Sequence, residues 1–285
     1  MGKSGTARQR LSSIKWNAIN RLGVDPFVRA FEMLPRSQAV RILESIQLTG
    51  QLDYAPAKIE MELRSVYDLS RLRSCFKEPR TIDWIEREVR PGDVFYDVGA
   101  NVGAYSLVAW AATGGRAKVY AFEPSYATFP ALCTNLRLNG CGDAVQPLPI
   151  ALSDRTQLLS FNYSSVRVGS AMHSVGEPID MFGKPFAPEF VQPVLSYRLD
   201  DMISSFALAP PTQIKIDVDG AEHLVLAGGA RTLERPSLRS LLVEVQLGSS
   251  SATQIVDRLS AQGFSLRGEG ASITDGFANY EFGRG

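Results

Sequence analysis

Residues 94–103 of this 285-residue chain read VFYDVGANVG. The first five are apolar except for Asp97, which predicts a short buried parallel strand. Gly99 and Gly103 mark a turn, and the apolar residues that follow recur at helical intervals as far as Gly114. An acid thus ends a strand, directly before a glycine loop that opens a helix. In open α/β sheets this position binds ligands.

The spacing of the loop glycines argues against a dinucleotide cofactor. In the dinucleotide pattern a middle glycine lets the pyrophosphate approach the backbone, and Asn101 stands at that position here. The carboxylate of Asp97 repels a pyrophosphate but suits a ligand with a cationic amino group. Glu123 follows the next apolar run, where an acid can accept hydrogen bonds from both hydroxyls of a ribose. Asp97 therefore favours an amino-acid nucleoside over NAD, and Glu123 supports this, although Glu123 alone would not discriminate because NAD sites also use a strand-end acid.

Four motifs of the chain resemble those of the FkbM family, which consists of class I S-adenosylmethionine-dependent methyltransferases. The motifs are GDVFYDVGANVG (92–103), FEP (122–124), ALSD (151–154) and IKIDVDGAE (214–222). The resemblance covers roughly residues 78–247. It implies S-adenosyl-L-methionine as the cofactor and O-methylation of a hydroxyl on a sugar, glycan or natural product.

The alternation of strand and helix patterns predicts an α/β, Rossmann-like class I methyltransferase fold. We expect a mostly parallel seven-stranded sheet with one antiparallel strand, helices on both faces, and an N-terminal helical extension. Residues 1–77 are assigned to a tail and this extension, and residues 78–285 to the S-adenosylmethionine-binding domain. Within the domain we expect one strand over 144–152, an irregular substrate-side loop over 164–193, and one helix over 221–233.

The N-terminal extension has a helical pattern of its own. Apolar residues between Ile14 and Leu48 recur at helical intervals and predict two or three short amphipathic helices. Their apolar faces either pack on the catalytic domain or form a substrate lid or a dimer contact, which leaves a homo-oligomer open. Residues 1–13 read as a disordered tail, and residues 1–6 fit a myristoylation pattern too permissive to carry a conclusion.

Composition narrows the choice of partners and compartment. The net charge is zero, which gives no electrostatic case for a nucleic-acid partner, so the expected partner is a small-molecule or glycan acceptor. The three cysteines form no C-x-x-C motif, and their odd number fits a reducing, cytoplasmic compartment. No apolar run is long enough to predict an integral membrane segment.

The predicted cofactor contacts lie in the glycine loop and at the ends of the following strands. Asp154 stands where this fold usually reads the adenine edge, although a plain Ser-Asp turn explains it equally well. The complete predicted set is Asp97, Gly99, Asn101, Gly103, Glu123 and Asp154.

Asp217 is the best candidate for the chemistry, because it ends the fourth core strand where the reactive methyl should lie. We expect it to orient or deprotonate an acceptor hydroxyl. His173 could take the same proton, although a lone loop histidine usually has no such role. Asp219 and Glu222 fit a helix capping box and need no catalytic role. Glu244 could bind a cation with Asp217, but no third ligand is evident, so no metal is predicted.

Two rival functions remain compatible with the residues. One is a nicotinamide oxidoreductase on the same topology, which Asn101 disfavours. The other is a catalytically silent cofactor-fold module that binds a partner through its N-terminal helices. Thermal shifts with S-adenosylhomocysteine and with NAD would separate these functions, because a ligand stabilises the native state that binds it.

Overall fold

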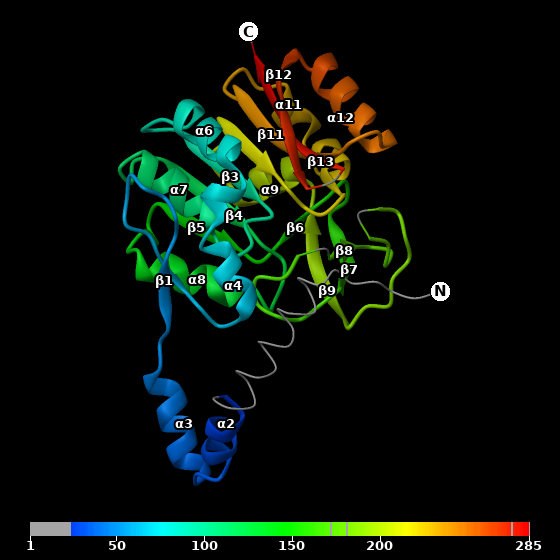
Figure 1. The fold of residues 1–285 in the computed structure, drawn as a ribbon. Coiled ribbons are helices and arrows are strands. Elements are labelled where there is room, and N and C mark those ends of the chain that lie inside the picture. The colour runs from blue at the N-terminus through cyan, green and yellow to red at the C-terminus, as the bar shows by residue number, and fades with distance from the viewer. Residues whose placement is uncertain (1–23, 172, 181, 275, 285) are drawn as a thin grey trace. The chain divides into compact units, whose positions relative to one another are not determined.

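The computed structural model describes residues 24–171, 173–180, 182–274 and 276–284 (Figure 1). The predicted tail, the myristoylation pattern and the first predicted helix lie outside these residues. The chain divides into two compact units, Met1–Leu48 and Thr49–Gly285. In the described part of the first unit, α2 (Asp25–Glu32) and α3 (Arg36–Ser45) form two of the predicted short helices. No helix among the described residues is long and apolar enough to cross a membrane.

The second unit is built on a seven-stranded sheet in the order β12-β13-β11-β10-β3-β4-β5. Only β13 runs antiparallel to its neighbours, and the other strand pairs are parallel. The predicted fold class, including the single antiparallel strand, is therefore confirmed. The strands are β3 (Val94–Val98), β4 (Lys118–Phe122), β5 (Val145–Leu148), β10 (Gln213–Ile216), β11 (Ser240–Gln246), β12 (Phe264–Thr274) and β13 (Phe277–Arg284).

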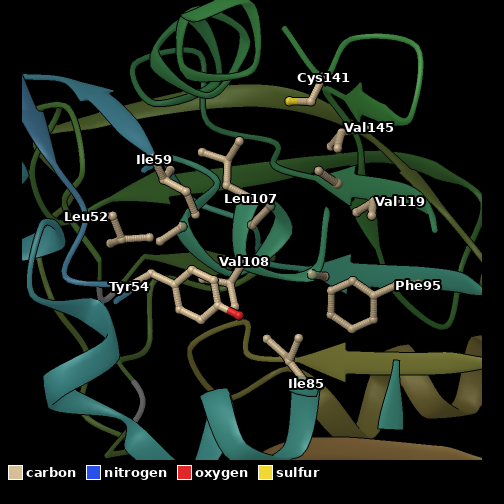
Figure 2. Packing of buried hydrophobic residues seen from close by; sticks show 14 of the residues in the cluster. Leu52, Tyr54, Ile59, Ile85, Phe95, Leu107, Val108, Val119, Cys141 and Val145 are labelled. Atoms are coloured by element: carbon tan, nitrogen blue, oxygen red, sulfur yellow. The ribbon is translucent and has the colours of Figure 1, made fainter. Parts of the chain in front are cut away.

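Helices cover both faces of this sheet because the strands bury side chains on both sides. Within β3, Phe95 belongs to the core on one face and Tyr96 to the core on the other. Figure 2 shows Phe95 and Val119 of the first face packed with Leu107 and Ile85. The first face carries α6 (Pro79–Glu88), α7 (Ala104–Ala112) and α8 (Phe129–Leu138), and the second α9 (Leu199–Phe206), α10 (Glu222–Gly228), α11 (Ala230–Leu233) and α12 (Ser250–Ala261).

Residues 49–77 belong to the same compact unit as the main sheet. Two asparagines, one in α8 and one at its C-terminus, hold the backbone of this segment. The side-chain oxygen of Asn135 accepts from the N–H of Glu62 at 2.7 Å, and that of Asn139 accepts from the N–H of Glu60 at 2.9 Å. The division of the chain into an extension over residues 1–77 and a domain over residues 78–285 stays a prediction. The segment contains β1 (Thr49–Gln51), β2 (Glu60–Glu62), α4 (Val66–Arg71) and α5 (Ser74–Lys77).

A four-stranded second sheet, which the sequence did not predict, follows β5. The expected single strand over 144–152 is wrong: β5 ends at Leu148, and Ala151 pairs with Ser196 in the second sheet. Pro149 lies at the break and cannot donate a ladder hydrogen bond. The expected loop over 164–193 also contributes strands. The sheet comprises β6 (Ala151–Leu152), β7 (Gln157–Tyr163), β8 (Ser174–Val175) and β9 (Phe190–Tyr197).

One helix also differs from expectation. The helix expected over 221–233 divides at Gly229 into α10 and α11. Glycine is a poor helix former, and Gly229 packs closely against Leu199 of α9, so the division accommodates a close helix contact.

Candidate active site

A cavity opens at the C-terminal ends of β3, β4 and β10. It lies at the topological switch point between β3 and β10, because β4 and β5 follow on one side of β3 and β10 and β11 on the other. It encloses about 790 Å³ of space, part of it open to solvent. The second sheet supplies another wall. Five of the predicted site residues line this cavity, namely Gly99, Asn101, Glu123, His173 and Asp217.

The glycine loop is held by its own backbone hydrogen bonds. Asn101 adopts a positive φ of 49°, and its side-chain oxygen accepts from the N–H of Val102 at 2.9 Å. All five N–H groups of residues 99–103 donate within the protein, so none is left to cradle a phosphate. The other four N–H groups share three acceptors: the Phe122 carbonyl accepts from Gly99 and Ala100, the Glu123 carboxylate from Asn101, and the Ala100 carbonyl from Gly103.

Gly99 makes its closest approach to protein rather than to the cavity. Its φ is +81°, and a Cβ built on it would lie 1.8 Å from the carbonyl oxygen of Asp217. Gly99 also lines the cavity, so its predicted contact with a cofactor stays a prediction. The glycine allows the end of β3 to pass directly against the end of β10.

Glu123 is a buried carboxylate at the end of β4. Its two oxygens accept backbone N–H groups of Ser125 and Asn101, each at 2.9 Å. Burial raises the pKa of Glu123 to about 7, although these two donors oppose the shift, and the negative charge of Asp219 adds to it. Each carboxylate oxygen has a second lone pair, so the group can still accept hydroxyls of a ligand.

Asp97 lies beneath the cavity rather than in its wall. It is fully buried, and the hydroxyl of Ser106 donates to its Oδ2 at 2.6 Å. The register of β3 and β10 places Lys215 directly beside it, with Nζ 3.8 Å from Asp97 Oδ1. The same Nζ lies 3.0 Å from Oδ2 of Asp217, which is two residues further and so on the same face of β10. Lys215 thus joins a buried acid to one that lines the cavity.

Lys215 is among the largest fully buried side chains of the unit. Burial alone would lower its pKa, but the carboxylates of Asp217 and Asp97 outweigh burial, so the pKa lies above its ordinary value and the ammonium is retained. The Nζ atom also lies 5.0 Å from the ring centroid of Tyr105. The sequence motif contains Lys215, but its role depends on which strand lies beside it.

His173 lines the cavity, yet both of its ring nitrogens are engaged. Nδ1 accepts the backbone N–H of Ser164 at 3.3 Å, so the ring proton belongs on Nε2, which lies 3.2 Å from the Ser170 hydroxyl oxygen. That hydroxyl donates onward to the carbonyl of Ser165 at 2.9 Å. Burial lowers the pKa of His173 to about 4. A neutral ring in this arrangement has no free lone pair with which to take a proton.

Arg71 of α4 also lines the cavity. Its Nε and Nη2 donate to the carbonyl of Gly169 at 3.1 and 2.9 Å. The Asn101 side chain donates to the carbonyl of Ser170 at 3.0 Å, and the Ser65 hydroxyl donates to that of Val168 at 2.8 Å. The loop that contains residues 168–170 is therefore hydrogen-bonded to two distant parts of the chain, the segment 65–71 and the glycine loop. Nothing in the local sequence around Arg71 marks it as a site residue.

Four other residues singled out in the sequence have surroundings that differ from those expected. Asp154 is outside the cavity lining and accepts a hydrogen bond from the Ser153 hydroxyl at 3.1 Å. Gly103 also lies outside the lining, and a Cβ on it would lie 2.5 Å from a methyl carbon of Leu132. The capping box of Asp219 and Glu222 is wrong: α10 has Ala221 at its N-cap, with no side-chain cap.

Asp219 instead bonds to the loop over the cavity. It adopts a positive φ of 54°, and its Oδ2 accepts the backbone N–H of His173 at 3.2 Å. Glu222 Oε1 accepts the N–H groups of Val218 and Gly220 at 3.0 and 3.1 Å. Within the described residues, no group of three or more His, Cys, Asp or Glu side chains is arranged to hold a metal ion.

Comparison with known proteins agrees with this architecture. The model of the methyltransferase FkbM domain matches residues 97–266, more than half of the chain. The chain is 28% identical over 186 residues to the hexuronic acid methyltransferase AglP of Haloferax volcanii, covering 65% of this chain and 70% of that protein. It is 28% identical over 201 residues to the 31-O-demethyl-FK506 methyltransferase FkbM of Streptomyces tacrolimicus, covering 64% and 76%.

A solved structure supports the fold alone. The crystal structure of methyltransferase FkbM from Methylobacillus flagellatus superposes with a TM-score of 0.50 at 15% sequence identity. The match covers 77% of this chain and 56% of that one, so this chain spans little more than half of its length.

Proposed function

Because this chain belongs to the methyltransferase FkbM family, we propose that it transfers a methyl group from S-adenosyl-L-methionine to a hydroxyl of a sugar, glycan or natural product. The relatives whose names state an acceptor act on a hexuronic acid and on 31-O-demethyl-FK506. The cytoplasm remains our proposed compartment, and an oligomer through α2 and α3 remains a prediction.

The observation that carries the cofactor proposal is the buried carboxylate of Glu123 in the cavity wall. A carboxylate at the end of the second strand can accept both ribose hydroxyls of an adenosyl group. Phe122, Ile150 and Leu152 give the same cavity an apolar surface suited to a purine ring. These residues fit an adenosyl cofactor, and the acid Asp219 suits its positive charge.

The closed glycine loop disfavours the oxidoreductase alternative. A nicotinamide dinucleotide needs free N–H groups, or a bare glycine, beside its pyrophosphate. The N–H groups of residues 99–103 are all engaged, and the Asn101 side chain is fastened to Ser170. Binding a pyrophosphate here would break several of these bonds.

We assign the chain two tasks in the transfer: holding the two reactants in line and keeping water away. The bound cofactor supplies a methyl group on a positively charged sulfur that leaves as a neutral thioether. We propose that Asp217 orients the acceptor hydroxyl and accepts its proton, because it lines the cavity and Lys215 restrains its carboxylate at 3.0 Å. His173 stabilises its own loop through Ser164 and Ser170 instead of acting as a base.

Calorimetric titration tests the cofactor assignment. S-adenosylhomocysteine should bind the wild-type protein, and NAD should not. Glu123→Ala should weaken that binding by about 1–3 kcal/mol, the range for a lost hydrogen bond to a charged group. Glu234→Ala is a matched control, because Glu234 is an exposed acid outside the cavity lining. Unchanged affinity in Glu123→Ala would remove that residue from the ribose site.

The silent-module alternative predicts a different outcome. A module that has lost catalysis would still bind S-adenosylhomocysteine but would transfer no methyl group to any hydroxyl acceptor in a lysate-derived glycan and metabolite pool. Incorporation of labelled methyl groups into such a pool, lost in Asp217→Asn, would support the enzyme.

A further inference from the structure

A second cavity lies beside the first, at the C-terminal ends of β10 and β11. The two cavities share Val175, Val218, Asp219 and Ala221 in their linings. An acceptor in the second cavity could therefore reach a group bound in the first.

Two carboxyl groups in this second cavity keep hydrogen-bonding capacity for a ligand. Glu244 is half-buried and makes no hydrogen bond and no ion pair with any described residue. Glu222 is 4% exposed, and its hydrogen bonds to backbone both go to Oε1, which leaves Oε2 without a bond from the described residues. These oxygens can therefore accept the hydroxyls of a ligand.

All ionisable side chains in the described lining of the second cavity are acids. Five acids line the cavity, Glu177, Asp180, Asp219, Glu222 and Glu244, and no described lining residue is a lysine, arginine or histidine. Ile179 is exposed and adds apolar surface, against which the C–H groups of a sugar ring can pack. A carboxylate or phosphate on the acceptor would face these acids with no cation in the lining to offset the repulsion.

We propose that the second cavity is the acceptor subsite, and that it selects a polyhydroxylated, pyranose-type acceptor carrying no carboxylate or phosphate. This rests on the proposed methyl transfer and specifies its substrate class. The hydroxyls of such an acceptor can donate to Oε2 of Glu222 and can exchange hydrogen bonds with the carboxyl of Glu244. The selection differs from that expected of a hexuronic acid methyltransferase such as the relative AglP.

The protonation state of Glu244 supports this assignment. Burial raises the pKa of Glu244 well above its ordinary value, and the negative charges of Asp217, Glu222 and Asp219 add to the shift. These surroundings favour the carboxylic acid form, which both donates and accepts a hydrogen bond. This matches a neutral hydroxyl, and the remaining acids of the lining still repel an anion.

The test is ligand-observed NMR titration of the full chain with S-adenosylhomocysteine bound. Three probes that differ in one group are used: methyl glucoside, methyl glucosaminide and methyl glucuronide. We expect the first two to bind and the glucuronide to bind at least about 5-fold more weakly, as like-charge repulsion at a part-exposed site requires. Glu244→Leu should weaken the glucoside roughly 2- to 10-fold through the lost hydrogen bond.

Reversing the charge of Glu177, an exposed acid of the cavity lining, should change glucuronide binding in the opposite direction. Glu177→Lys should strengthen glucuronide binding roughly 2- to 5-fold and leave the glucoside unchanged, because Glu177 is exposed and its side chain makes no hydrogen bond with the described residues. Glu234→Lys, with the same charge change outside the cavity lining, should leave both unchanged.

Two results would overturn the proposal: glucuronide binding as tightly as glucoside to the wild-type protein, or no binding of any probe. In both cases calorimetry with S-adenosylhomocysteine reads the cofactor site separately. Retained cofactor binding would leave the methyltransferase proposal standing, and its loss would remove that proposal.

Discussion

Replacing Gly99 by alanine should destabilise the second unit far more than the same change at a comparable glycine. Gly99, Gly103 and Gly92 all have φ values between +81° and +91°, so each alanine bears a similar backbone cost of about 1–2 kcal/mol. They differ in what the new Cβ meets. At Gly92 nothing lies within 4 Å, so Gly92→Ala measures the backbone cost alone.

The added cost at Gly99 follows from its distance to Asp217. The new Cβ would lie 1.8 Å from a backbone oxygen, whereas real Cβ atoms keep at least 3.0 Å, so the end of β10 must move by more than 1 Å. That movement would strain the bond from the Asp217 N–H to the Val98 carbonyl, now 3.1 Å. Together with the backbone cost we expect about 3–5 kcal/mol, a large part of the stability of an ordinary domain.

Urea unfolding followed by circular dichroism measures the series. Gly103→Ala should fall between the other two, because its Cβ meets only a methyl group of Leu132 at 2.5 Å, and a leucine side chain can move. A free energy of unfolding for Gly99→Ala equal to that of Gly92→Ala would refute the contact between the ends of β3 and β10.

Three further predictions concern the charged groups. Burial raises the pKa of Glu123 from 4.5 to about 7, so the native state binds more protons than the unfolded state between these pH values. The free energy of unfolding should therefore fall as pH rises through that window and level off above it, while S-adenosylhomocysteine affinity should rise through pH 7. Glu123→Gln should flatten both profiles, measured by urea unfolding and by calorimetric titration. Lys215→Met should cost about 3–5 kcal/mol by leaving Asp97 and Asp217 without their buried cation, and adding Asp97→Asn should recover part of that loss; a neutral single variant would contradict the ion pairs. Asp217→Asn should keep cofactor affinity but lower turnover roughly 10²- to 10⁴-fold, so full activity would defeat its role. EDTA should leave wild-type activity intact, and inhibition would favour a cation held by Asp217 and Glu244.

The amino-acid sequence by itself determined the central strand–loop–helix unit. It also determined that the acids at the ends of neighbouring strands meet at one edge of the sheet. The run 94–98, its glycine loop and the following helix form one unit whose periodicities are local. Repeating such units predicts a parallel sheet, because crossover connections between parallel strands have one hand. The acids at the ends of β3, β4 and β10 then converge at one edge, which is why Glu123 and Asp217 could be predicted to share a site.

Other features were decided by tertiary structure. Lys215 lies between Asp97 and Asp217 only because β10 pairs with β3 in one particular register. Arg71 reaches the loop at Gly169, and Glu244 enters the second cavity, across long sequence separations. A sequence pattern reports which way a side chain faces within its own element, with a period of two or 3.6 residues. It carries no information on the register between elements or on the close contact of two backbones, and those set which charges meet inside the protein.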